Sequence, residues 1–127
     1  MRTATVEIAG KSWPVCYSTA VMLACEERYG SANGVFDALS ADALGEKLQA
    51  LFWLTHQMLR AGASYELFLG QPAESPPDED ELRDLLGMDD VLPLQRALVS
   101  AIVGDVRREV EAELPKNAGA TPPAAKE

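Results

Sequence analysis

The sequence has little of what secreted disulfide scaffolds, membrane proteins and nucleic-acid-binding proteins need. Its 127 residues include two cysteines, fewer than the disulfide framework of a secreted domain carries. Acidic side chains outnumber basic ones by 20 to 11, and the formal net charge of -9 argues against binding the phosphates of nucleic acid. Apolar runs such as residues 51–54 are far shorter than the ~20 residues of a membrane span, and we expect no apolar signal segment at the N-terminus. We therefore expect a cytoplasmic protein that binds neither membranes nor nucleic acid.

What is present is the composition of one globular domain. A hydrophobic fraction of 47% allows a core to form without disulfides or a metal. We expect a mainly α fold, a small helical bundle with an N-terminal β-hairpin over about residues 4–17. The domain spans residues 1–114, and the tail over 115–127, rich in Ala, Pro and Gly, is expected to be disordered.

The hairpin is predicted from the alternation of apolar and polar residues on either side of a glycine. A turn at residues 10–11 would place the apolar residues of both strands on one face. Pro14 has no N–H and therefore belongs at a non-hydrogen-bonded pair, which favours a four-residue loop over residues 9–12. Because an isolated hairpin is marginally stable, its apolar face must pack on helices.

Apolar residues at helical spacing predict the remaining elements. The expected helices cover about residues 18–29, 35–39, 41–61, 65–69 and 91–114. Ser18 and Gly30 suit the two ends of the first helix, and Gly62 is expected to end the longest one. The middle of that helix is apolar nearly all round, so it should form the centre of the core. An acidic, proline-containing linker over about 71–81 precedes the last helix.

Few side chains of the kind that carry out catalysis are present. The single histidine, His56, has no Cys, Asp or Glu three or four residues away, so we expect a structural role. Cys16 and Cys25 lack the spacing of a redox or zinc motif and are expected to be buried thiols. The acidic run over 78–81 is better explained as the start of a helix, capped by Ser75 or Asp78, than as a metal site. We therefore expect no enzyme, no cofactor and no metal.

The order of the elements carries a family resemblance. The hairpin contains Ile8-Ala9-Gly10-Lys11, the first helix ends in Glu26-Glu27-Arg28-Tyr29-Gly30, and Leu51-Phe52-Trp53-Leu54 lies at the centre of the long helix. Over residues 5–69 this resembles the tail assembly chaperones of long-tailed, siphovirus-like bacteriophages and prophages. The resemblance implies a protein that binds the tape-measure protein in the host cytoplasm, keeps it soluble, helps to recruit tail tube subunits and is absent from the mature virion.

The resemblance assigns no binding residues, so the partner surface has to be predicted from the sequence. We place it on the last helix, at Leu98, Ile102, Val106 and Val110, although this stripe could equally close the bundle. Other functions also remain open: a head–tail connector or tail-completion protein, and a bacterial regulatory adaptor. A homo-oligomer is compatible with each of them.

Overall fold

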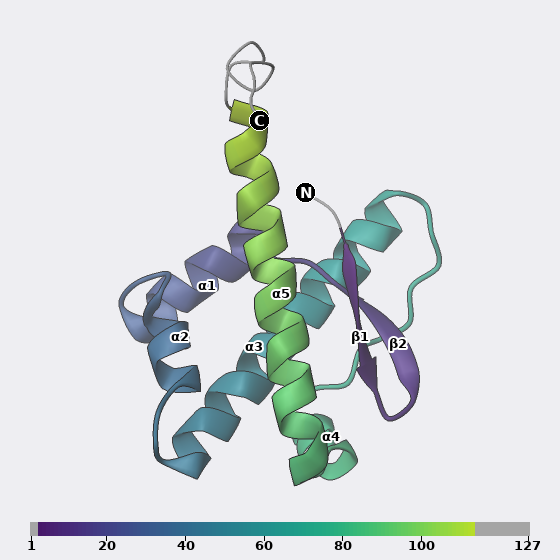
Figure 1. The fold of residues 1–127 in the computed structure, drawn as a ribbon. Coiled ribbons are helices and arrows are strands. Elements are labelled where there is room, and N and C mark those ends of the chain that lie inside the picture. Colours follow the sequence, from purple (N-terminus) through teal and green to yellow (C-terminus); the bar gives the residue numbers. More distant parts are fainter. Residues whose placement is uncertain (1–2, 114–127) are drawn as a thin grey trace, which may run out of the picture.

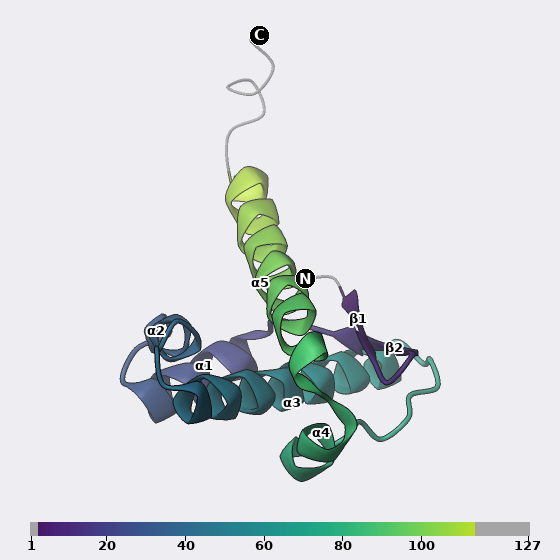
Figure 2. The same ribbon diagram turned by 60° about the horizontal axis from the view of Figure 1, so that its bottom comes forward.

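The computed structural model describes residues 3–113 and, among the side chains, those up to residue 104. A hairpin is followed by five helices over this part of the chain: β1 (Ala4–Ile8), β2 (Lys11–Val15), α1 (Thr19–Tyr29), α2 (Gly34–Leu39), α3 (Leu44–Phe68), α4 (Glu79–Leu85) and α5 (Met88–Glu113). α3 crosses the body, the hairpin and α2 pack on it, and α5 rises from the body (Figures 1 and 2). The predicted fold class, mainly helical with an N-terminal hairpin, is confirmed. The predicted disorder of residues 115–127 lies outside the described residues.

The hairpin turns earlier than predicted. β1 and β2 are antiparallel and Ile8 pairs with Lys11, so the loop consists of Ala9 and Gly10 and not of the expected four residues. Both loop residues have positive φ, 54° and 78°, as a two-residue turn of type I′ requires. Hydrogen-bonded and non-hydrogen-bonded pairs alternate from Ile8–Lys11 onward, which places Pro14 at a non-hydrogen-bonded pair. The requirement set by Pro14 is therefore met by shifting the turn, without a longer loop.

α3 continues through Gly62, where the helix was expected to end. β2 crosses α3 at this point so closely that a Cβ on Gly62 would lie 2.2 Å from the Pro14 carbonyl oxygen. In the same crossing the Cys16 N–H donates to the Met58 carbonyl oxygen at 3.1 Å. Gly62 is thus a packing residue within the helix, because the strand backbone occupies the space of a side chain.

The two ends of α3 also differ from prediction. The helix begins at Leu44 and not near residue 41, since Ser40 still belongs to the end of α2 and donates its N–H to the Phe36 carbonyl oxygen. The separate short helix expected over 65–69 is the last turn of α3. Gly70, with φ of 81°, follows that turn.

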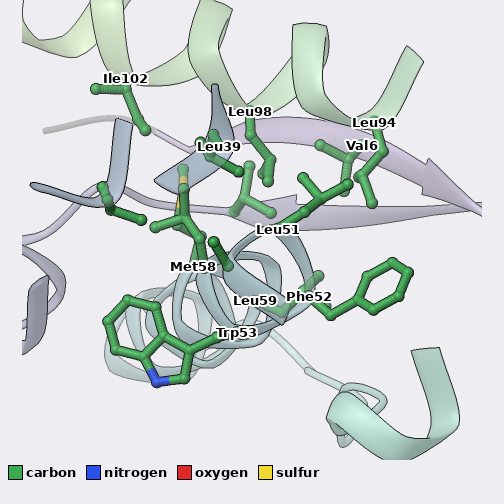
Figure 3. Close-up of a cluster of buried hydrophobic side chains, with 14 of the residues drawn as sticks. Val6, Leu39, Leu51, Phe52, Trp53, Met58, Leu59, Leu94, Leu98 and Ile102 are labelled. Carbon is green, nitrogen blue, oxygen red and sulfur yellow. The ribbon is translucent and has the colours of Figure 1, made fainter. Parts of the chain in front are cut away.

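The core surrounds α3, as predicted. Leu51, Leu54 and Met58 are fully buried. Leu51 and Met58 lie between the hairpin, α2 and α5 (Figure 3). Trp53 points to another side of the helix and packs edge-on against Tyr29, with ring centroids 5.6 Å apart. α3 is therefore covered on several sides and holds the other elements together.

The predicted helix caps of α1 and α4 are confirmed. The Ser18 hydroxyl accepts the Val21 N–H at 3.3 Å, and Gly30 ends α1 with φ of 83°. Asp78 accepts the Glu81 N–H at 2.9 Å while the Glu81 carboxylate accepts the Asp78 N–H at 3.0 Å. The carboxylates at the start of α4 thus form a capping box, which satisfies N–H groups that have no partner within the helix.

α5 begins at Met88, three residues before the expected Val91. The Gly87 N–H donates to the Asp90 carboxylate at 2.9 Å and so joins the chain to the first turn. Pro93 consequently lies in the second turn of α5 and not in the first. In the second turn, the missing N–H of proline removes one helical hydrogen bond.

Candidate protein-binding surfaces

His56 holds the linker between α3 and α4 against the body. Its Nδ1 lies 3.1 Å from the Pro77 carbonyl oxygen, and Lys11 of the hairpin pairs with Glu74 nearer the middle of the linker. This is the structural role expected of the histidine. Over the described part of the chain, no three His, Cys, Asp or Glu side chains are grouped so that they could hold a metal ion.

The two cysteines are both buried, as expected, and are not joined in a disulfide. Burial raises the pKa of the Cys25 thiol above its ordinary value of 9.0. Burial is also the main cause that raises the pKa of Tyr17 above its ordinary value of 10.0, and the negative charge of a Cys25 thiolate raises it further. The Cys25 thiol therefore stays protonated at neutral pH, the form in which cysteine is a poor nucleophile.

The partner surface predicted on the last helix divides into two parts. Leu98 and Ile102 are 0% and 4% exposed and point from α5 into the core, towards Leu39 and Leu51 (Figure 3). Their prediction as surface residues needs correction, because a partner could reach them only if α5 left the body. Val106 and Val110 lie outside the residues whose side chains are described.

A patch of apolar side chains instead lies at the C-terminal end of α3. Leu67, Phe68 and Leu69 are all exposed, and Phe68, at 86%, is the most exposed of the large apolar residues described. Three consecutive residues point in different directions around a helix, so the body cannot cover all of them. We call these three residues the α3-end patch.

A hollow of about 360 Å³ lies beside this patch, between β2, α3 and the linker. Trp13 and Pro14 line one side, and Pro72, Ala73 and Pro76 line the other. The hollow is mainly apolar, with the Lys11 ammonium 4.7 Å from the centre of the Trp13 ring. Glu66 and Gln71, which flank the α3-end patch in the chain, line the hollow, whereas the three patch residues themselves do not.

This region was not predicted, although the sequence contains part of its signal. Three large apolar residues directly before Gly70 exceed what one helix face can bury, which would have indicated an exposed end. The hollow has no such signal, because it depends on where the linker runs across the hairpin.

Neither a membrane-spanning helix in the described residues nor a similar known protein helps to assign this surface. No helix within residues 3–113 combines the length and the hydropathy that a membrane span requires. Comparison of the chain with protein-family models, curated proteins and solved structures finds no match.

Proposed function

We propose that this chain is a tail assembly chaperone, which binds the tape-measure protein of a long-tailed phage or prophage and keeps it soluble in the host cytoplasm. The observation that carries the proposal is the α3-end patch. Exposed apolar side chains and an apolar hollow near the same end of α3 are typical features of a protein-binding site. In this chain they occur on a molecule whose net charge is -9.

The resemblance over residues 5–69 supports the same function. Its basis is the order of a short hairpin, a helix ending at Gly30, a small helix and a long apolar helix, which is the order from β1 to α3. The resemblance implies a partner that is long and helical and exposes apolar stripes before the tail tube encloses it. Apolar side chains on the chaperone would cover such stripes and so delay aggregation of the partner.

The distribution of charge suits this role. An excess of acidic groups repels other copies of the complex and keeps it dispersed at high concentration.

Co-expression tests the proposal. The chain is produced together with the long tape-measure-like protein encoded beside it, and the solubility and co-purification of that protein are measured. We expect it to be insoluble alone, and soluble and bound in the pair. The variant Phe68→Ser should weaken co-purification. Leu23→Ser, which changes a side chain that is 65% exposed on α1, should leave it unchanged.

Two results would contradict the proposal. If the tape-measure-like protein remains insoluble and does not co-purify, the chaperone function is wrong, and a regulatory adaptor becomes the better explanation. If the chain is present in stoichiometric amounts in purified virions, it is a structural component such as a connector or tail-completion protein.

A further inference from the structure

α5 carries a second apolar face that the core does not use. One face points into the core and consists of Val91, Leu94, Leu98 and Ile102. The other face is exposed: Met88 is 63%, Leu92 52% and Val103 48% accessible. Val99 lies between Leu92 and Val103, is half-buried, and does not pack against the core cluster. We call Met88, Leu92, Val99 and Val103 the outer stripe of α5.

The spacing of the outer stripe is that of a helix–helix seam. Together with Gln95, its residues are separated by four, three, four and four positions, which places them within roughly 80° of one another around the helix. The stripe is rotated by about 100° from the core-facing side chains. A stripe of residues three or four positions apart is what a second helix needs to pack lengthwise along α5.

The position of α5 leaves this seam accessible. The helix rises from the body, and towards its C-terminal end no other helix or strand of the described residues lies beside it (Figures 1 and 2). The sequence continues the same spacing at Val106 and Val110, and the α5 backbone is helical to Glu113.

Neither the C-terminal segment of this chain nor a second copy of the protein fits this surface well. The sequence after Leu114 contains no Val, Ile, Leu, Met or aromatic residue, so it cannot supply the side chains that fill a seam. A second copy would bring together two molecules that each carry a net charge of -9. Residues 79–104 contain α4 and the part of α5 whose side chains are described, and they carry six carboxylates and two arginines. One of the arginines, Arg83, already pairs with Asp80.

We infer that the outer stripe of α5 is the docking site for a basic amphipathic helix of a partner protein. The partner's apolar residues pack on Met88, Leu92, Val99 and Val103, and its lysines or arginines face Asp89, which lies beside Met88 in the first turn of α5. Gln95, the single polar residue at a seam position, fixes the register of the two helices. The inference rests on the proposed function to the extent that the tape-measure protein supplies this helix.

A designed peptide tests the docking site directly. The probe is a fluorescently labelled helical peptide of several heptads, with Leu at heptad positions a and d and Lys at the flanking positions e and g. Repulsion between the lysines keeps the peptide from pairing with itself. Its binding to the full chain is measured by fluorescence anisotropy. We expect the double variant Leu92→Lys/Val103→Lys to weaken binding by more than about tenfold. Both substitutions are on exposed side chains, and circular dichroism checks that the variant folds.

Two controls define the chemistry of the site. Leu23→Lys places one lysine on an exposed side chain of α1, away from the outer stripe, and should leave the affinity unchanged. A peptide with Glu in place of Lys should bind at least about tenfold more weakly to the wild-type chain.

The outcomes separate this inference from the proposed function. If the basic peptide does not bind, or binds the double variant equally well, the docking site is wrong even where the tape-measure-like protein co-purifies. If the peptide binds as expected but the tape-measure-like protein does not co-purify, the docking site stands and the chaperone function falls. If the wild-type chain sediments as a dimer that Leu92→Lys/Val103→Lys dissociates, a second copy occupies the stripe and the inference is overturned.

Discussion

The two long helices differ in how they use nearly equal lengths. α3 has 25 residues and is buried on several sides, with Leu51, Leu54 and Met58 fully covered. α5 has 26 residues and contributes one face to the core, while a second apolar face stays exposed. Both helices have strong apolar patterns in the sequence, yet α3 packs against the fold on several sides and α5 does so on one. Apolar content alone therefore does not show whether a residue serves folding or binding; its place relative to the neighbouring elements does.

The largest expected effect on the free energy of unfolding comes from replacing a leucine on the core-facing side of α5, compared with a leucine on the outer stripe. Leu98→Ala should lower the free energy of unfolding by about 3 kcal/mol, because it leaves a cavity in the core. Leu92→Ala, one and a half turns earlier on the outer stripe, should change it by less than about 0.5 kcal/mol. Urea denaturation of both variants measures the difference. Equal losses would mean that the outer stripe also supports the fold.

A smaller effect is expected at the crossing of α3 and β2. Gly62→Ala would push a Cβ against the Pro14 carbonyl oxygen and should cost about 2 kcal/mol, as overpacking typically does. Gly45→Ala lies in the first turn of the same helix with nothing within 4 Å of the new methyl group. It should be neutral or stabilise by about 0.5 kcal/mol. Thermal unfolding compares the two alanines, and a stable Gly62→Ala variant would show that the strand can move away from the helix.

The smallest effect concerns pH on the α1 side of the core. Burial raises the pKa of Cys25 in the folded state, so folding favours the protonated thiol. This contribution to stability is fully present below the ordinary pKa of 9.0 and is lost as the pH rises through the raised folded-state value. The unfolding midpoint in urea should therefore fall at alkaline pH. In Cys25→Ala the fall should be shallower, with Tyr17, whose pKa is also raised, providing the remainder.

The sequence predicted features that depend on neighbouring residues and failed where distant segments meet. The caps formed by Ser18 and Asp78 involve side chains within three residues of the groups they satisfy, so the sequence contains the whole motif. Gly62 was misassigned as a helix end because its role depends on Pro14, which is 48 positions away (62 minus 14) and approaches only in the folded chain.

The same limit applies to the candidate binding surfaces. Along the last helix the sequence shows two neighbouring apolar stripes, and it contains no information about which of them β1 and α3 will cover. The structure places Leu98 on the covered side and Leu92 on the open side. The hollow beside Trp13 could not have been predicted, because it forms where the linker crosses the hairpin.

The turn of the hairpin offers a practical gain in stability. Ala9 adopts φ of 54°, a left-handed conformation that costs a residue with a Cβ about 1 kcal/mol, whereas asparagine tolerates it better. Its side chain is exposed, and replacing it alters neither the core, the α3-end patch nor the outer stripe. Ala9→Asn would thus give a more stable background. Destabilised core variants made in that background could still be purified and compared with one another.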